Sequence, residues 1–310
     1  MKGQERALKI LSGFRCSGKI PSALLFHGPP GVGKRTLALE WAAAIVCERP
    51  GEEGAACGAC RGCEAAGRGA HPDLRLVGAA YQAALLGEEP ETQRALKVDT
   101  IRHLRREMET TSLWGGWKIS ILEDAQTLES ASANALLKIL EEPKPRTLWI
   151  LLAVSPESLP KTIVSRCARV PFSALRAGDV EEILAARGVP APKARAIARL
   201  SGGSAGRAVE MWEEAADGEE EAPAKGDPLA PFSLAESLPR ELPLARRKAE
   251  RIIALEIEKL RLDVIERRVP FSKAGPALRE LRDLLRAVGS NADPRAAVVL
   301  SRIALEVLSS

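Results

Sequence analysis

Aromatic residues are scarce in this sequence: five Trp, five Phe and one Tyr make up 4% of its 310 residues. Proteins that bind single-stranded nucleic acid by base stacking need aromatic side chains for the purpose. The scarcity argues against stacking as a main binding mode. The net charge is also small, at +4 from 45 basic and 41 acidic residues. Any contact with DNA should therefore be local, made through phosphates and shared with partners.

The sequence also lacks long hydrophobic runs. No uninterrupted stretch of about 18 apolar residues could cross a bilayer. The opening residues, Met1 to Arg6, contain no apolar signal segment. We expect a globular protein of the cytoplasm without a membrane partner. Its length gives room for two or three domains at roughly 100–150 residues each.

What the sequence does contain is a phosphate-binding loop, Gly28-Pro-Pro-Gly31-Val-Gly33-Lys34. The loop follows the apolar run Ala23–Phe26 and opens a helical pattern from about residue 33 to residue 46, the strand, loop and helix context of such sites. Glycines let backbone N–H groups face an anion, and Lys34 adds a positive charge. The alternative is an ordinary Gly/Pro turn before a helix.

The loop carries a defect, because Arg35 stands where a Ser or Thr hydroxyl normally binds Mg²⁺. Thr36 is a poor substitute, since one step along a helix turns a side chain by roughly 100° and moves it by about 1.5 Å. The sequence predicts that ATP or ADP binding is possible and that hydrolysis is weak or absent.

A second defect lies at the end of the predicted strand Lys118–Leu122, where Glu123 precedes Asp124. In a loop-type ATPase an Asp at this strand end helps to hold Mg²⁺, and a following Glu polarises the attacking water. The reversed order displaces each carboxylate from its task, so the sequence favours a degenerate ATPase. The alternative is a strand end capped by solvated acids.

Four cysteines form a C-x9-C-x2-C-x2-C array: Cys47, Cys57, Cys60 and Cys63. Four thiolates can close a tetrahedral structural zinc site, and a reducing compartment disfavours disulfides. We interpret residues 47–63 as a zinc module that braces a loop and catalyses nothing, because no coordination position stays open. Free thiols or disulfides, and an iron–sulfur cluster, are the alternatives. The nearby His71 is redundant as a ligand, and a loop-stabilising role suits it better.

The chain divides into segments of different character. Residues 1–172 alternate helical patterns with β-rich runs, which predicts an α/β domain with a parallel sheet. Residues 173–212 indicate three short helices, and the acidic stretch 213–231 indicates a helix tail and linker. Residues 232–310 show helical periodicity without strand signals, and their longest helix is expected over Leu244–Arg267. The predicted strands are Ala23–Phe26, Lys118–Leu122, Leu148–Ala153 and Ala168–Pro171.

Two further motifs complete a distinctive pattern, Ala133-Asn-Ala-Leu-Leu-Lys-Ile-Leu-Glu-Glu-Pro143 and Ser165-Arg-Cys167. Together with Gly3-Gln4, the phosphate loop, the four cysteines and His71-Pro-Asp73, they make residues 1 to about 210 resemble the clamp-loader subunits of bacterial DNA polymerase III, which are AAA+ proteins. The delta-prime class is the most similar. The C-terminal third fits the helical collar of the family only by pattern.

The resemblance implies an AAA+ domain, a helical lid domain and an α-helical collar, within a ring of five related subunits whose ATP sites lie at interfaces. The implied partners are the tau/gamma motor subunits and the clamp-opening delta subunit. Primer–template DNA is met through the assembled complex, and the sliding clamp weakly or indirectly. Motor subunits carry Thr after the loop lysine and an Asp-Glu strand end, and this chain has neither.

The resemblance also assigns roles to two arginines. Arg166 would act in trans, placing a permanent positive charge beside the γ-phosphate in a neighbour's ATP site; a surface arginine in a turn is the alternative. Arg207 matches the second nucleotide sensor, although an ordinary helix-surface arginine would also explain it. We therefore expect a non-hydrolysing subunit of a DNA polymerase holoenzyme. The alternatives are a motor subunit of the same complex and an unrelated zinc-braced nucleotide-binding module.

Overall fold

A computed structural model of the chain describes residues 2–51, 54–93, 95–217, 232, 235–236, 238–265, 267–290 and 292–306. The chain separates into two compact units, Met1–Val209 and Glu210–Ser310.

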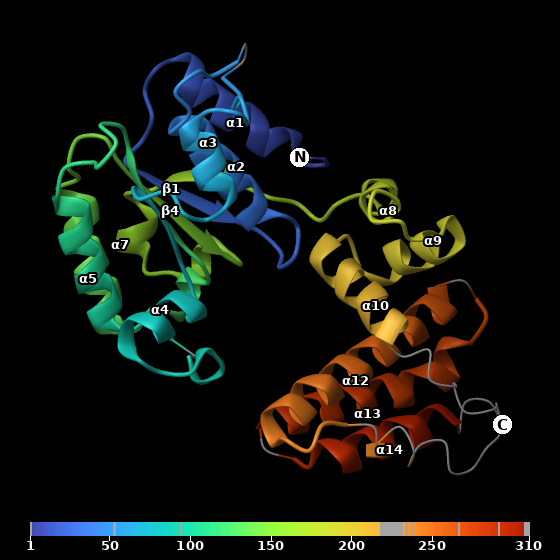
Figure 1. The fold of residues 1–310 in the computed structure, drawn as a ribbon. Helices are drawn as coiled ribbons and strands as arrows, with labels where there is room; N and C mark the ends of the chain where they lie inside the picture. Colours follow the sequence, from blue (N-terminus) through green and yellow to red (C-terminus); the bar gives the residue numbers. More distant parts are fainter. Residues whose placement is uncertain are drawn as a thin grey trace. The chain divides into compact units, whose positions relative to one another are not determined.

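The first unit is built on a sheet of five parallel strands in the order β2-β3-β4-β1-β5. Figure 1 labels β1 and β4 within this sheet. Every residue of β3 and β4 is buried, as expected for a parallel sheet covered on both faces. The sequence predicts four of the strands and misses β2, a short edge strand in which a charged residue, Arg75, interrupts the apolar run. The strands are β1 Ala23–His27, β2 Leu74–Val77, β3 Lys118–Leu122, β4 Thr147–Ala153 and β5 Ala168–Pro171.

Side chains of the strands alternate between the two faces of the sheet. Leu25, Trp149 and Leu151 belong to a core shared with α5, α6 and α7. Leu24 and Ile150 belong to a second core shared with α1 and α2. The sheet therefore lies between two helical layers, formed by α1 Glu5–Cys16 and α2 Lys34–Ile45 on one face, and α5 Val98–Glu109, α6 Ser130–Glu141 and α7 Lys161–Val164 on the other.

Shorter elements connect these layers. They are α3 Arg61–Gly67, α4 Ala79–Leu86 and the 3₁₀ turns η1 Pro90–Thr92, η2 Ala125–Thr127 and η3 Pro156–Ser158. After β5 come α8 Ala177–Ala185, α9 Ala191–Leu200 and α10 Ala205–Asp217, where the sequence predicts three short helices. Helix α10 extends to Asp217, into the segment predicted as helix tail and linker; residues 218–231 of that segment lie outside the described residues.

The second unit contains α12 Leu242–Ile265, α13 Phe271–Ser290 and α14 Pro294–Glu306. These helices share one core, which includes Ile253, Leu281 and Val298. Within its described residues the unit has helices and no strand, in agreement with the pattern of the sequence. Across the described part of the whole chain, no helix combines the length and apolarity needed to span a bilayer.

Candidate functional site

The predicted phosphate loop connects β1 to α2, as its sequence context requires. Gly31 has φ 70°, and a side chain there would collide with the hydroxyl of Ser204. The backbone N–H of Gly206 donates a hydrogen bond to the carbonyl of Gly31, at 2.9 Å. The start of α10 therefore packs directly on the loop, which explains the need for glycine at position 31.

Lys34 folds back on the loop. Its Nζ donates to the carbonyl oxygens of Gly28 and Pro29, at 2.6 Å each. Burial lowers the pKa of Lys34, and the nearby Asp124 carboxylate opposes that shift. The ammonium group thus lies where an anion in the loop would meet it.

Arg35 forms an ion pair with Glu123, with 3.0 Å between Nε and Oε1. Glu123 follows β3 and lies over Gly78, where a Cβ would collide with its Oε2. Burial raises the pKa of Glu123; the Arg35 guanidinium opposes this shift, and Asp124 adds to it. The two sequence defects, far apart in the chain, therefore meet in one ion pair.

Magnesium does not fit this arrangement. The usual hydroxyl position holds Arg35, and the first carboxylate at the strand end is paired with its guanidinium. Thr36 is exposed, and so is Asp124, whose Oδ1 accepts a hydrogen bond from Gln126 Nε2 at 2.9 Å. The side chains at the two metal-binding positions bind each other instead.

Arg207 lies on α10, next to the residues that contact the loop. Its backbone N–H donates to Ser204 Oγ at 3.2 Å. Its Nη2 is buried and has no hydrogen-bond partner among the described residues. A buried donor without a partner is costly, and a phosphate oxygen is a suitable acceptor for it.

Gln4 ties the loop to the segment that leads to α8. Its side chain is 3% exposed, and Nε2 donates to the carbonyls of Val32 at 3.3 Å and Ser173 at 2.8 Å. Its Oε1 accepts from the N–H of Ser173 at 3.2 Å. The Gly3-Gln4 motif thus has a structural reason that sequence reasoning did not supply.

Arg166 stands just after α7, on the surface. Its Nη2 lies 2.8 Å from Glu141 Oε1, and its Nη1 donates to the carbonyl of Thr162 at 3.0 Å. The Arg166 side chain is 36% exposed. The next residue, Cys167, is buried in the core, and burial raises its pKa to about 12. The Ser-Arg-Cys motif therefore combines a buried anchor with an outward guanidinium, and Glu141 is a partner that the sequence did not indicate.

The phosphate loop and Arg166 lie at opposite ends of two neighbouring strands, β1 and β5. Strands β1 and β5 are parallel neighbours, with Leu24 paired to Ala168 and His27 to Pro171. Arg166 precedes β5, whereas the loop follows β1. Four strand residues at about 3.3 Å each separate the two strand ends by about 13 Å of backbone.

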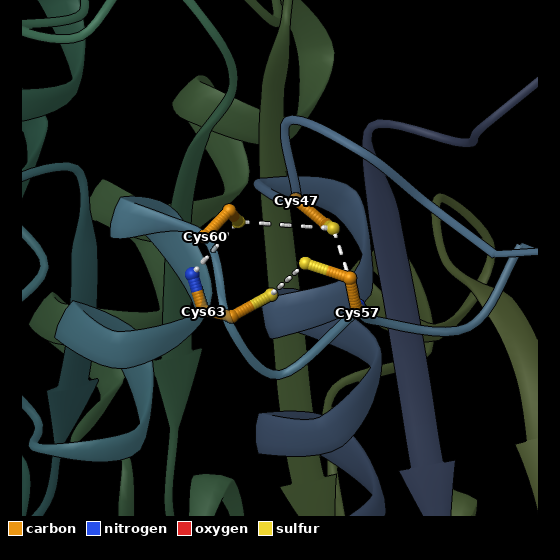
Figure 2. Close-up of side chains that lie close together, drawn as sticks. All are labelled: Cys47, Cys57, Cys60 and Cys63. Carbon is orange, nitrogen blue, oxygen red and sulfur yellow. Dashed lines mark hydrogen bonds between the residues drawn. The ribbon is translucent and has the colours of Figure 1, made fainter.

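The four cysteines of the array converge (Figure 2). Their sulfurs all lie within 4.8 Å of one another, with 3.9 Å from Cys57 to Cys63 and from Cys47 to Cys60. A tetrahedron with Zn–S bonds of about 2.3 Å has edges of about 3.8 Å. Backbone N–H groups, led by that of Cys63, lower the pKa of the Cys60 thiol to about 6. The cluster can hold a metal ion such as zinc.

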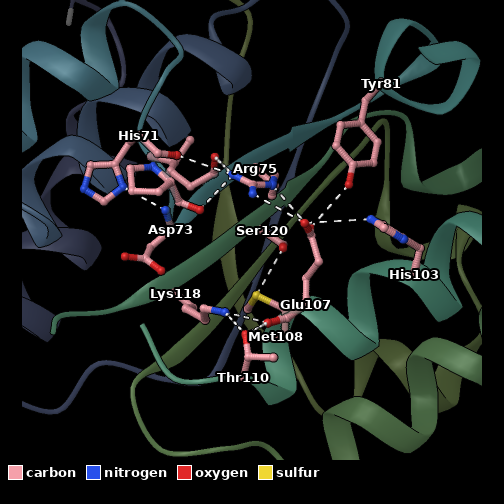
Figure 3. A network of polar contacts seen from close by, with 12 residues as sticks. His71, Asp73, Arg75, Tyr81, His103, Glu107, Met108, Thr110, Lys118 and Ser120 are labelled. Carbon is pink, nitrogen blue, oxygen red and sulfur yellow. Dashed lines mark hydrogen bonds and ion pairs between the residues drawn. The ribbon is translucent and has the colours of Figure 1, made fainter. Parts of the chain in front are cut away.

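His71 and Asp73 stabilise a loop that contacts the cysteine segment. The N–H of Asp73 donates a hydrogen bond to His71 Nδ1 at 3.1 Å (Figure 3). The Asp73 carboxylate accepts hydrogen bonds from the hydroxyl of Ser112 and the N–H groups of Leu113 and Trp114, at 2.9, 2.9 and 3.1 Å. The His71 ring meets the Trp114 ring edge-on at 4.7 Å. Arg61, from α3, lies over the same indole at 3.9 Å. These contacts agree with the loop-stabilising role predicted for His71 and join the cysteine segment to the loop before β3.

A neighbouring network joins the edge strand β2 to α5 (Figure 3). Glu107 pairs with Arg75 at 3.3 Å and accepts from the Tyr81 hydroxyl at 3.4 Å. Lys118 Nζ donates to the Glu107 carbonyl and to Thr110 Oγ1 at 2.5 Å each. The network borders a cavity of about 340 Å³. Its donors have protein acceptors, so we assign it to structure.

Comparison with known proteins places the chain in a family. Residues 3–176 match the family described as "DNA polymerase III, delta subunit". DNA polymerase III subunit delta' of Pseudomonas aeruginosa is 38% identical over 185 residues, which are 59% of this chain and 53% of that protein. DNA polymerase III subunit tau of Escherichia coli is 34% identical over 181 residues, 58% of this chain and 26% of that protein. The chain thus spans about half the length of the delta' relative.

The fold has a relative among solved structures. A DNA polymerase III gamma subunit-related protein of Thermotoga maritima aligns over 98% of this chain and 99% of its own, with a TM-score of 0.53 and 17% identity. At that identity the likeness concerns the fold alone. The match over residues 3–176 carries the assignment: the chain belongs to the delta-prime family of DNA polymerase III clamp-loader subunits.

Proposed function

We propose that this chain is a non-hydrolysing subunit of a bacterial clamp loader and that it lends Arg166 to the ATP site of a neighbouring motor subunit. The clamp loader would place the sliding clamp on primed DNA, with this chain in a heteropentamer beside tau/gamma and delta subunits. Family membership supports the complex.

One observation carries the role of Arg166. Its exposed guanidinium follows a backbone position at the amino-terminal ends of the parallel strands, while the chain's own phosphate loop lies at their carboxyl-terminal ends. An arginine side chain is shorter than the four strand residues that separate these two ends. Arg166 is therefore suited to a phosphate held by another subunit, where a guanidinium stabilises the charge of phosphoryl transfer.

A motor role is the second candidate, because the tau subunit of Escherichia coli is 34% identical over the aligned region. The Arg35–Glu123 pair argues against it, since it occupies the positions that hold a catalytic metal in motor ATPases. A motor should hydrolyse ATP when purified alone, and Lys34→Ala should abolish that activity. The proposed subunit should be inert alone.

The decisive test is reconstitution with tau/gamma and delta subunits, a sliding clamp and primed DNA. We expect Arg166→Ala to lower ATP turnover at the neighbouring site by a factor on the order of 10³. The total ATP turnover of the complex should fall by the fraction that this site contributes. Arg166→Lys should restore little, because lysine lacks the planar fork. The control is Arg169→Ala, which removes the same positive charge at an exposed position nearby. Unchanged turnover and clamp loading with Arg166→Ala would refute the role.

A further inference from the structure

The Arg35–Glu123 pair occupies the place of a divalent metal. In phosphate-loop ATPases the metal lies between the hydroxyl after the loop lysine and an acid at a neighbouring strand end. Here those two positions are joined by an ion pair of 3.0 Å. The site therefore differs from the usual metal site of such ATPases in a specific way. Glu123 binds the guanidinium of Arg35, a cation fixed to the chain, in place of a dissociable metal ion.

Arg35 keeps binding capacity beyond this pair. The contact with Glu123 uses Nε, and a guanidinium carries four further N–H donors on its two Nη atoms. The Arg35 side chain is 61% exposed, whereas that of Glu123 is 24% exposed. Glu123 therefore anchors the base of the guanidinium and leaves its outer fork accessible. Such a fork suits phosphate oxygens.

The remaining parts of a phosphate site are also present. Among the described residues, Lys34 Nζ donates to two neutral carbonyls of the loop and is in direct contact with no carboxylate, although the Asp124 carboxylate lies nearby. Nη2 of Arg207, one residue from the Gly206–Gly31 contact, is buried without a partner among the described residues. Lys34 gains if an anion enters the loop, and Arg207 belongs to the helix start that packs on the loop. Lys34 requires no metal for that gain.

We infer that the loop binds the polyphosphate chain of a nucleoside di- or triphosphate without a divalent metal, with Arg35 supplying the charge that Mg²⁺ supplies elsewhere. This inference deepens the proposed function, because it rests on the loop being a phosphate site that cannot hydrolyse its ligand. The ligand would serve as a structural group that holds α10 against the loop.

The test measures binding to the full-length chain by titration calorimetry, with ADP, ATP and inorganic pyrophosphate as separate probes, each in EDTA and in Mg²⁺. For the natural chain we expect the same affinity for ADP or ATP in both conditions. Pyrophosphate binding as tight as that of ADP would mean that the phosphates alone provide the affinity. Mg²⁺-dependent binding, or no binding of any probe, would overturn the inference.

Two variants sharpen the test. Arg35→Thr restores the usual hydroxyl; it should weaken nucleotide binding in EDTA by about tenfold or more, the loss of one charge-assisted hydrogen bond, and should recover affinity when Mg²⁺ is added. Arg169→Ala should bind as the natural chain does, and thermal melting of each variant reports folding. Equal affinities of Arg35→Thr and the natural chain in EDTA would contradict the role of Arg35.

The two proposals fail separately. A loop that binds nothing, combined with an Arg166→Ala effect in the reconstituted complex, removes only the metal-free site. Metal-free binding without any effect of Arg166→Ala removes only the arginine role.

Discussion

Asp73 shows how one buried side chain organises a segment far away in the sequence. It is 4% exposed and accepts three hydrogen bonds from residues 112–114. Burial alone would raise the pKa of Asp73, but the N–H groups of Leu113 and Trp114 and the Ser112 hydroxyl outweigh it and lower the pKa. The ionised form is therefore the one that stabilises the fold.

We predict that Asp73→Asn lowers the free energy of unfolding at pH 7 by about 1–3 kcal/mol, because the amide places donors against donors. The folded pKa of Asp73 is depressed, so its contribution is present above the unfolded value of about 3.9 and is lost as pH falls through the folded pKa. Urea unfolding at pH 7 and below pH 4 checks both points. The natural chain and the variant should converge in acid; parallel curves would contradict the assignment.

At the same scale, some site residues could be predicted from the sequence and others could not. Gly31, Lys34 and Arg35 belong to a contiguous motif, so their chemistry can be interpreted locally. The contact of Glu141 with Arg166, and that of Gly206 with Gly31, join residues distant in sequence. No local pattern encodes such pairs, because the topology of the sheet brings them together.

At the scale of elements, the pattern of the sequence predicted four strands, the helix after the phosphate loop and an alternation of strands with helices. Strand β2 was missed because Arg75 interrupts it, and its pairing with β3 comes from the sheet and not from its own composition. The same holds for the start of α10. The sequence predicted a helix there, but it did not predict that the helix packs on the phosphate loop.

The cysteine segment is the element most open to a direct test. We expect the purified chain to contain one zinc ion per molecule, measured by elemental analysis. Cys60→Ser removes a buried ligand and should abolish metal binding, because three thiolates hold zinc less tightly than four. Cys16→Ser changes an exposed thiol outside the cluster and should keep the metal. Iron in place of zinc, or full zinc content in Cys60→Ser, would contradict the prediction.

Loss of the metal should also loosen the contact between α3 and the loop before β3. Arg61 and Trp114 form that contact, at 3.9 Å. We expect faster amide hydrogen exchange at residues 112–117 in Cys60→Ser than in Cys16→Ser.

At the scale of the whole molecule, the chain carries separate cores in its two units. The cores around the sheet draw only on residues before Glu210, and the core of α12, α13 and α14 only on residues after it. Separate cores permit separate unfolding.

We predict two transitions in differential scanning calorimetry. Leu281→Ala, at a fully buried position of the second unit, should lower the free energy of unfolding of that unit by about 2–5 kcal/mol and move only its transition. Leu136→Ala, fully buried between α6 and the sheet, should move only the other. A single transition shifted equally by both variants would show that the units unfold as one.

The placement of the phosphate loop and Arg166 at opposite ends of the parallel strands gives each protomer a direction. In the proposed complex, each subunit donates an arginine from one end of its strands and receives one at the other end. Such subunits must join head to tail, with two different surfaces in every contact. A subunit that donates an arginine but cannot hydrolyse ATP at its own site suits the end of such a row of subunits. The ion pair of Arg35 and Glu123 would then mark the subunit at which the row of ATP-hydrolysing sites ends.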